Sequence, residues 1–304
     1  MSKHALIMNR NSGTVLRLGE DRVLQIVDEC MGGHISDVHL LDVAAIPDMV
    51  ENIASSKPEG IVFGGGDGTA VYAADLLAEH KIPFAILPLG TMNLLAQDLG
   101  SAATFEETAA RFKGFSPDHI DAGKVNGKTF LCAASVGFMP EGAVMREELR
   151  ENPSLTGIAR FVGNIARGIG GEIKNDFVLK SRSGDKGFPV TTTSLVISNN
   201  SFVKEPADAS ERFLRETLNE GKLAVYSAAP RDMMDGLKMA LSMWQGDWQD
   251  HESIRSFETQ ELIVETDGEK ALVTLDGEPM EMQNPLVFKI LPRSVPVLRM
   301  ELAA

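Results

Sequence analysis

The first 120 residues alternate short apolar runs with stretches of helical periodicity, and this alternation constrains the fold more than any other feature of the chain. We expect strands and helices in turn at residues 4–8, 21–31, 34–41, 47–55, 60–63, 69–80 and 84–87. Strands that alternate with helices in this way form a parallel sheet covered by helices. The pattern therefore predicts an α/β domain whose ligands bind beyond the carboxyl ends of the strands.

The sequence changes character near residue 121, where β-rich runs bounded by turn residues begin. A length of 304 residues is enough for two domains. We predict an α/β domain at residues 1–121, with a possible return of the chain at about 294–304. Residues 122–293 are expected to form a mostly antiparallel, β-sandwich-like domain with helical insertions. The functional site is expected in the crevice between the two domains.

Charge and cysteine content narrow the classes of partner. The chain has 29 basic and 43 acidic residues, a net charge of −14, which repels polyanions and argues against nucleic-acid binding. Its two cysteines, Cys30 and Cys132, provide neither a disulfide framework nor a CxxC metal site, which favours a reducing, cytoplasmic compartment. No run approaches the roughly 18 apolar residues of a membrane span, so we expect peripheral membrane contact at most. A homodimer is left open.

Residues 59–69, Glu-Gly-Ile-Val-Phe-Gly-Gly-Gly-Asp-Gly-Thr, form an apolar strand that leads into glycines, an acid and a threonine that opens a helix. Glycines permit positive φ angles and a close approach of backbone to phosphate, and the helix N-terminus offers N–H groups and partial positive charge. Asp67, set among these donors, suits a group that holds Mg²⁺ against phosphates. The alternative is a tight strand-to-helix turn capped by Asp67.

A second strand runs into a polar turn at residues 86–93, Ile-Leu-Pro-Leu-Gly-Thr-Met-Asn. If the two strands are parallel neighbours, Thr69, Thr91 and Asn93 surround one crevice. The alternative is a capped turn ahead of a core helix.

Together these segments resemble the catalytic domain shared by diacylglycerol kinases, sphingosine kinases and related bacterial lipid kinases. Segments 121–130 and 275–279, which read D-A-G-K-V-N-G-K-T-F and L-D-G-E-P, are also similar to that family, so the resemblance covers nearly the whole chain. Three loops with the patterns N-P-x-S-G, G-G-D-G-T and P-x-G-T-x-N form the family's ATP site. The matching residues here are Asn9, Arg10, Asn11, Ser12, Gly13, Gly65, Gly66, Asp67, Gly68, Thr69, Thr91 and Asn93.

The resemblance implies an ATP-dependent kinase that transfers the γ-phosphate, with the assistance of Mg²⁺, to a hydroxyl of a diacylglycerol-like or related lipid. It implies that Asp67, Asp121 and Glu220 are metal ligands. It also implies that Asp276 or Glu278 orients or deprotonates the acceptor hydroxyl, and the sequence does not decide between them. Alternation within a strand would place these two carboxylates on the same face.

Several positions depart from the family pattern. Arg10 stands where the first loop usually has proline, Val71 and Tyr72 replace an Asn-Glu pair, Leu94 replaces an aspartate, and Glu220 replaces the aspartate of the metal loop. These changes leave the metal network and the lipid open, and Arg10 is either a phosphate contact or an exposed turn residue. Two other functions stay open: a NAD kinase-like nucleotide kinase, although that family's T-P-T-G-S-T-A-Y segment is missing, and a non-catalytic nucleotide-sensing protein.

Two helical segments, residues 155–169 and 230–248, carry apolar side chains at helical spacing, Phe161 and Trp244 among them. Such a stripe is more often part of a core. Because methionines adapt well to acyl chains and the second segment is rich in them, we expect any attachment to a membrane to use exposed apolar or basic surface in these two segments.

Overall fold

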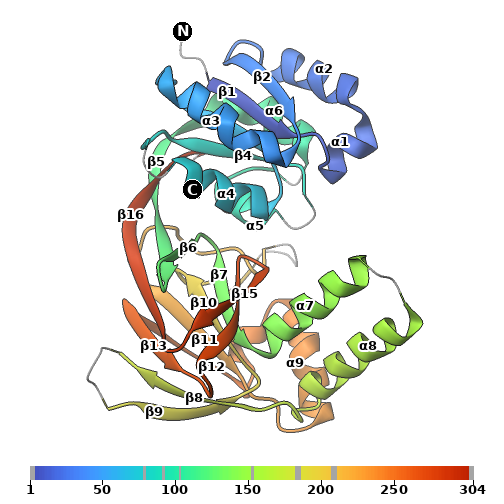
Figure 1. Cartoon of the computed structure of the whole chain (residues 1–304), viewed down its shortest axis with the longest axis vertical. Helices are drawn as coiled ribbons and strands as arrows, with labels where there is room; N and C mark the ends of the chain where they lie inside the picture. Colours follow the sequence, from blue (N-terminus) through green and yellow to red (C-terminus); the bar gives the residue numbers. More distant parts are fainter. Residues whose placement is uncertain are drawn as a thin grey trace. The chain divides into compact units, whose positions relative to one another are not determined.

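The computed structural model describes residues 4–77, 80–90, 93–102, 104–151, 154–181, 186–206 and 211–300. The chain divides into two compact units, of which the N-terminal unit comprises Met1–Ile120 and Arg293–Ala304 and the second comprises Asp121–Pro292 (Figure 1). The chain therefore passes from the first unit into the second and returns. The functions expected of the two units, ATP binding and lipid binding, stay predictions.

The N-terminal unit has the alternating strands and helices that the sequence predicts. Its strands are β1 (His4–Asn9), β2 (Ile35–Leu41), β3 (Ile61–Gly65), β4 (Phe84–Pro88), the start of β5 (Phe115–Val125) and the end of β16 (Leu286–Met300). Its helices are α1 (Gly13–Leu18), α2 (Glu20–Met31), α3 (Ile46–Ser55), α4 (Asp67–Leu77), α5 (Leu94–Asp98) and α6 (Phe105–Arg111), with short 3₁₀ turns at Val43–Ala45 and Phe112–Gly114.

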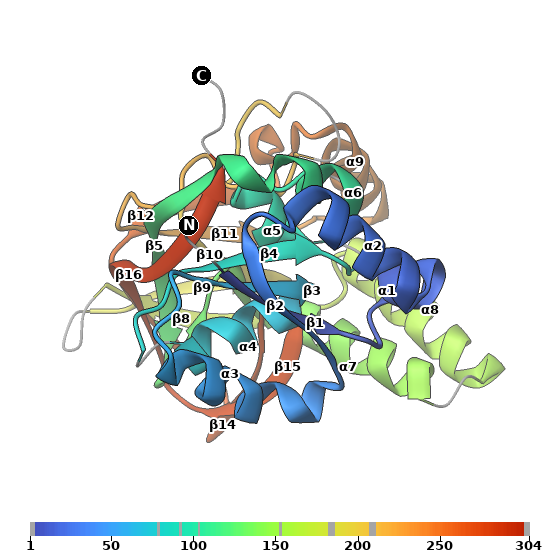
Figure 2. The same ribbon diagram turned by 90° about the horizontal axis from the view of Figure 1, so that it is seen from above.

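Five of these strands form a parallel sheet in the order β2-β1-β3-β4-β16, and β5 pairs with β16 outside this order. Every residue of β3 and β4 is buried, as expected for central strands covered on both faces. Figure 2 shows α2 and α6 on one side of the sheet and α3 and α4 on the other. The α2 and α6 side encloses a core that includes Leu6, Val27, Val62 and Phe105. The predicted α/β architecture of this unit is confirmed.

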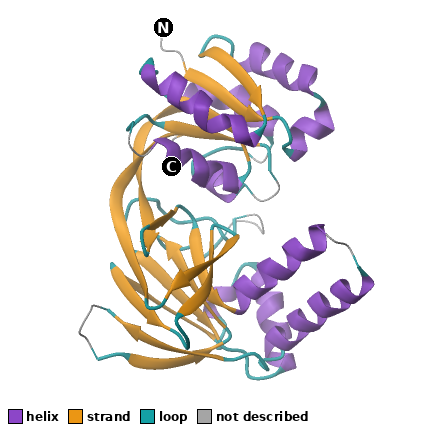
Figure 3. Ribbon diagram, viewed as in Figure 1, coloured by secondary structure: helices purple, strands orange, loops and turns teal. Residues whose placement is uncertain are grey.

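The second unit is rich in antiparallel strands. These are β6 (Lys128–Phe130), β7 (Ala133–Gly137), β8 (Asn175–Lys180), β9 (Phe188–Thr192), β10 (Ser194–Asn199), β11 (Leu223–Ala228), β12 (Ile254–Thr259), β13 (Glu261–Glu265), β14 (Lys270–Leu275) and β15 (Glu278–Gln283), with the end of β5 and the start of β16. Its helices are α7 (Phe138–Glu151), α8 (Leu155–Ile169) and α9 (Met233–Gln245), with a 3₁₀ turn at Trp248–Asp250 (Figure 3).

Two sheets of this unit share one apolar core, which confirms the expected sandwich-like arrangement. One sheet has the order β12-β11-β10-β7-β14-β15, and the other contains β16, β13, β8 and β9. Val136 and Ile197 of the first sheet and Phe177 and Phe288 of the second belong to the same buried cluster. None of the helices in the described part of the chain is long and apolar enough to cross a membrane.

Candidate functional site

Three loops of the N-terminal unit converge where neighbouring parallel strands end. The registers pair Met8 with Gly64 and Gly65 with Pro88, so β1, β3 and β4 end side by side. The Thr14 amide donates to the Leu89 carbonyl at 3.3 Å, and the Leu89 amide donates to the Gly65 carbonyl at 3.0 Å. The structure thus brings together the three loops expected to form an ATP site, except that Thr91 lies outside the described residues.

The glycines of these loops permit close packing. A Cβ atom on Gly65 would lie 2.3 Å from Thr69 Oγ1, and one on Gly90 would lie 2.5 Å from the Gly66 Cα atom. Gly64, Gly65, Gly66 and Gly90 do not adopt the left-handed backbone conformation. Their small size is what the loops require, because a side chain at Gly65 would collide with Thr69 and one at Gly90 would collide with the backbone of Gly66.

Asp67 and Asn93 hold the second and third loops in place. Asp67 is the first residue of α4, and its Oδ1 atom accepts a hydrogen bond of 3.1 Å from the Leu95 amide at the start of α5. Asn93 is buried and left-handed, with a φ of 53°. Its side chain accepts from the Gly90 amide and donates to the Gly90 carbonyl, both at 2.9 Å. Asn93 therefore shapes the turn, and Asp67 joins the two helix starts.

The first loop is organised by its own side chains. Asn9 Oδ1 accepts a hydrogen bond of 2.9 Å from the Asn11 amide, and Asn11 Nδ2 donates to Asp42 at 2.9 Å. Ser12 is buried at the start of α1, and its hydroxyl has no hydrogen-bond partner among the described groups. A buried hydroxyl ordinarily has a partner, so Ser12 is a group whose partner a ligand could supply.

Arg10 is held by the protein. Its Nη2 atom donates to the Leu40 carbonyl at 3.0 Å, and its Nε atom lies 3.6 Å from a carboxylate oxygen of Glu20. The side chain is only half-buried, but these contacts draw it toward the end of β2 and the start of α2. A phosphate contact by Arg10 would have to compete with them.

In the second unit, Asp276 and Gly277 form the turn of the β14–β15 hairpin. Both have positive φ angles, 48° and 93°, as a two-residue Asp-Gly hairpin turn requires. Glu278 is the first residue of β15 and is exposed. The expectation that Asp276 and Glu278 lie on one face of a strand is therefore wrong, because Asp276 belongs to the turn.

Three backbone amides hold the Asp276 carboxylate. The Leu131 amide donates to Oδ2 at 2.7 Å, and the Cys132 and Ala133 amides donate to Oδ1 at 2.7 and 2.8 Å. Burial raises the pKa of Asp276, while these amides and the Arg215 charge act in the opposite direction. Asp276 is thus fixed in orientation, whereas Glu278 extends from an exposed position.

Sequence patterns did not identify two polar residues that support this segment. The buried Arg215 donates to the Leu131 carbonyl, and its Nη2 atom lies 3.7 Å from Cys132 Sγ. Asn199 Nδ2 donates to the same Leu131 carbonyl at 3.1 Å and to the Asp121 carbonyl at 2.7 Å. The pair Asn199–Asn200 is typical of a turn, and no local pattern shows that either side chain is buried.

Comparison with known proteins identifies the N-terminal part of the chain. Residues 3–125 match the model of the diacylglycerol kinase catalytic domain, a range that contains all three converging loops. This segment, which is less than half of the chain, is similar to the diacylglycerol kinase catalytic domain. The resemblance inferred from the loop motifs is thereby confirmed.

Named relatives of this family match over less than half of their length. A "Probable lipid kinase YegS-like" protein of Pseudomonas syringae pv. syringae is 34% identical over 124 residues, which are 40% of this chain and 40% of that protein. A "Diacylglycerol kinase" of Mycobacterium tuberculosis is 30% identical over 145 residues, 45% of this chain and 43% of that protein. The matched part thus spans about two fifths of these relatives.

Structural similarity extends over both units. A crystal structure of a diacylglycerol kinase from Bacillus anthracis matches with a TM-score of 0.67 and 17% identity, covering 98% of this chain and 97% of that one. At this level of identity the comparison establishes the fold alone. It confirms that an α/β unit followed by a β-rich unit is the architecture of diacylglycerol kinase relatives.

Two of the metal ligands implied by the family pattern, Asp121 and Glu220, differ in their exposure to solvent. Asp121 is fully buried, and its Oδ2 atom accepts a hydrogen bond of 2.6 Å from the Gly221 amide. The neighbouring Glu220 is exposed, and its amide donates to Asn200 Oδ1 at 3.1 Å. Within the described ranges, no three His, Cys, Asp or Glu side chains are grouped to hold a metal ion. The contacts give Asp121 a structural role, and the metal set as a whole stays a prediction.

Proposed function

We propose that this protein is an ATP-dependent lipid kinase that transfers the γ-phosphate to a hydroxyl group of a diacylglycerol-like or related lipid. The convergence of the three strand-end loops, within a segment of the diacylglycerol kinase catalytic-domain family, carries this proposal. The names of the relatives, a lipid kinase and a diacylglycerol kinase, support the same class of acceptor.

The N-terminal unit would hold the nucleotide. The close packing at Gly65, Gly66 and Gly90 lets backbone approach phosphate oxygens, and the N-terminus of α4 contributes partial positive charge beside them. The Ser12 hydroxyl, which has no partner among the described residues, is a further donor for a phosphate oxygen. In a protein of net charge −14, such local donors are what allow a polyanion to bind.

Asp67 fits a magnesium site of the usual kind, in which one or two carboxylates act together with substrate phosphates. Its Oδ1 atom is oriented by the Leu95 amide, which fixes the carboxylate between two helix starts. Mg²⁺ bound there would neutralise charge on the phosphates. Because the Asp121 carboxylate already accepts a hydrogen bond from the Gly221 amide, Asp67 is the carboxylate best suited to this role.

The second unit would supply the carboxylate that acts on the acceptor. The acceptor oxygen attacks the γ-phosphorus, and the bond between the γ-phosphorus and the ADP oxygen breaks. The hydroxyl proton passes to a carboxylate. Asp276 suits this step because three amides fix its direction and burial raises its pKa, which strengthens it as a base. Glu278 is the other carboxylate of the segment and stays the alternative.

Single-turnover transfer of labelled γ-phosphate tests the proposal. The purified protein would be mixed with labelled ATP and, separately, with dispersed diacylglycerol, a mixed lipid extract or NAD. We expect label in a lipid product, and no label in NAD. Label in NAD but in no lipid would replace the proposal by a nucleotide kinase, and ATP binding without transfer to any acceptor would replace it by a nucleotide-sensing protein.

A further inference from the structure

Large apolar side chains face solvent on two helices of the second unit. On α8 these are Leu155, Ile158 and Val162, and on α9 they are Met233, Met234, Leu237, Leu241 and Trp244. Leu155 is 86% exposed and Trp244 is 67% exposed, so these residues do not belong to a core. We call these eight side chains the α8–α9 apolar surface. Soluble proteins seldom leave so many large apolar side chains together without a partner.

The outward direction of the apolar stripe on α8 has a packing cause. A Cβ atom on Gly157 would lie 2.8 Å from Leu149 of α7, and one on Gly168 would lie 2.6 Å from Phe138 of the same helix. α8 therefore packs on α7 through its glycines, and Asn164 is buried on that side too. Because the small residues occupy the packed side, the large apolar residues at positions 155, 158 and 162 point away from the protein.

The two helices contact each other at the end of α8 and the beginning of α9, so the two exposed stripes lie on one connected pair of helices. A Cβ atom on Gly236 of α9 would lie 1.7 Å from the Ile169 carbonyl oxygen at the end of α8. The Cβ position of Gly170, just after α8, lies 3.2 Å from Met233 Cε. The end of α8 thus packs against the beginning of α9 within the same unit, as the neighbouring ribbons in Figure 1 show.

The charge on these helices differs from that of the whole protein. α8 has no acidic residue, and the single acid of α9, Asp235, is buried against Arg231. Two exposed arginines of α8 have acidic neighbours, Arg160 at 3.8 Å from Glu148 and Arg167 at 3.6 Å from Glu172. Such exposed ion pairs are weak, so both guanidinium groups can turn toward another anion.

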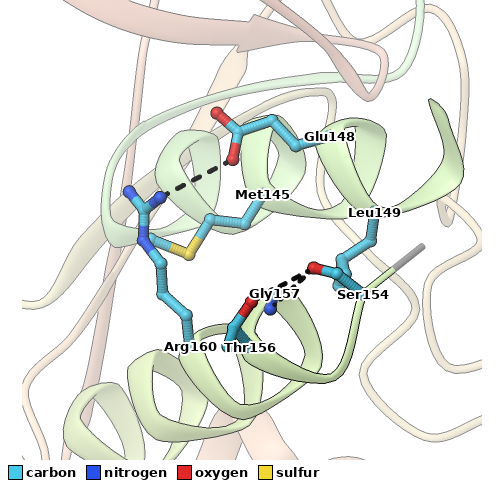
Figure 4. Close-up of a pocket in the computed structure, with 7 residues that line it drawn as sticks. All are labelled: Met145, Glu148, Leu149, Ser154, Thr156, Gly157 and Arg160. Atoms are coloured by element: carbon cyan, nitrogen blue, oxygen red, sulfur yellow. Dashed lines mark hydrogen bonds and ion pairs between the residues drawn. The ribbon is translucent and has the colours of Figure 1, made fainter. Parts of the chain in front are cut away.

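Arg160 also lies at the edge of a cavity. This cavity of about 370 Å³ lies between α7 and α8. Figure 4 shows the residues that line it, with the Arg160–Glu148 ion pair on one side and Met145 and Leu149 on α7. Ser154 caps α8 there by accepting a hydrogen bond of 3.0 Å from the Gly157 amide. The Arg160 side chain is 68% exposed and is therefore accessible to a lipid headgroup.

We infer that the α8–α9 apolar surface docks on a lipid bilayer that contains anionic headgroups. The inference rests on the proposed function, because a lipid kinase must reach an acceptor in a membrane. Leucine, isoleucine and methionine side chains can enter the acyl region, tryptophan favours the interface, and the arginines can contact phosphate groups. The scarcity of acids on these helices favours this occupant, since the net charge of −14 of the whole protein opposes an anionic surface.

Vesicle sedimentation at near-physiological salt tests the inference. The probes are phosphatidylcholine vesicles with and without phosphatidylglycerol, and the variants are a triple substitution, Leu155→Gln, Ile158→Gln and Val162→Gln, and the single substitution Trp244→Ser. We expect the triple variant to bind at least about tenfold more weakly, because three exposed apolar side chains no longer enter the bilayer. The control is Phe188→Gln on β9, a residue 50% exposed, which should bind like the natural protein.

Substitution of the arginines separates the apolar and ionic contributions. Arg160→Gln and Arg167→Gln should each weaken binding to phosphatidylglycerol vesicles by up to about fivefold, with little change on phosphatidylcholine alone. Natural-level binding by both the triple variant and Trp244→Ser would overturn the inference. A stable dimer that the triple variant dissociates in sedimentation equilibrium would also overturn it, by making the surface a subunit interface.

Transfer to diacylglycerol in detergent micelles distinguishes failure of the inference from failure of the proposed function. The triple variant should keep natural transfer in micelles while its transfer on vesicles falls. Vesicle binding that depends on α8 and α9, in a protein that phosphorylates no lipid, would support the surface and reject the kinase. Normal lipid phosphorylation with vesicle binding unaffected by every variant would do the reverse.

Discussion

At the scale of single residues, Asp67 offers the cleanest test of the nucleotide site. Its carboxylate Oδ1 accepts one hydrogen bond from the Leu95 amide, and the amide oxygen of asparagine can accept the same bond. Asp67→Asn should therefore keep the fold but remove the charge that would hold Mg²⁺. We expect phosphate transfer to fall by about 10²-fold or more, as for loss of a group that stabilises charge in a transition state.

A matched control for this change is Asp21→Asn, since Asp21 is also an acid in the first turn of a helix and is exposed. It should leave transfer unchanged. Thermal unfolding of both variants should match that of the natural protein. Full activity in Asp67→Asn would remove Asp67 from the reaction, and a large fall in thermal stability would show that its role is structural.

Asp276 and Glu278 can be separated by the pH dependence of turnover. Because burial raises the pKa of Asp276, the acidic limb of the kcat profile should lie above the ordinary aspartate value of 3.8. Glu278→Gln should keep that limb and lose less than about tenfold in kcat, since its exposed side chain supports no fold contact in the described structure. Loss of the limb in Glu278→Gln would assign the base to Glu278.

Asp276→Asn also tests whether Asp276 is the base, because it removes the carboxylate itself. One of its oxygens would become an NH₂ group facing a backbone amide, so a loss of stability is expected together with loss of transfer. For this reason the pH profile of the Glu278 variant decides the assignment, and the loss in the Asp276 variant supports it.

At the scale of secondary-structure elements, Asp235 fastens the start of α9. Its carboxylate accepts hydrogen bonds from the Arg231 amide at 2.9 Å, from Arg231 Nε and Nη2 at 3.1 and 3.0 Å, and from Ser253 Oγ at 2.6 Å. These donors, with those of Arg231 first, lower the pKa of Asp235 well below its ordinary value of 3.8. The folded state thus favours the ionised form.

The sign of the resulting pH effect follows from this lowered pKa. The stabilisation by Asp235 is fully present above pH 3.8 and is lost as the pH falls toward the folded-state pKa. Asp235→Asn should lower the free energy of unfolding at pH 7, and its difference from the natural protein should shrink below pH 3.8. Urea unfolding at several pH values measures this. Asp250→Asn, which breaks an exposed ion pair with Lys204, should change little, and a pH-independent difference for Asp235→Asn would contradict the assignment.

The elements that sequence patterns predicted best are the strands that are buried on both faces. Strands β3 and β4 are buried on both faces and therefore appear as continuous apolar runs, which made the α/β unit predictable. The helix α7 was not predicted, because Pro140 and Gly142 interrupt its start, although proline is tolerated in a first turn. The periodicity of α8 gave its bounds, but not the fact that its glycine side packs inward.

The candidate site was also predictable only in part. The three ATP loops were predictable because each directly follows a strand, and parallel strands end at the same edge of a sheet. The environment of Asp276 was not, since its partners at residues 131–133 are more than 140 positions away in the chain. Arg215 and Asn199 donate to the Leu131 carbonyl in the same segment, and both are buried only once the unit has folded.

At the scale of the whole molecule, net charge and local surface have opposite effects on membrane binding. The net charge of −14 repels an anionic bilayer, and the range of that repulsion is set by salt. Near physiological ionic strength the Debye length is about 8 Å, so charges far from the docked helices are largely screened. Binding then depends on the α8–α9 apolar surface and its neighbouring arginines.

Lowering the salt concentration should therefore weaken binding to phosphatidylglycerol vesicles. At about 0.01 M salt the Debye length grows to about 30 Å, which brings the excess acids of the whole protein within range of the bilayer. A basic peripheral protein would bind more tightly under the same change. Sedimentation with vesicles across a salt series measures the trend, and pure phosphatidylcholine vesicles, which carry no net charge, should show almost none. Affinity that rises steadily as salt is removed would mean that the docked face is cationic enough to outweigh the other charges, contrary to the weakly charged surface described for α8 and α9.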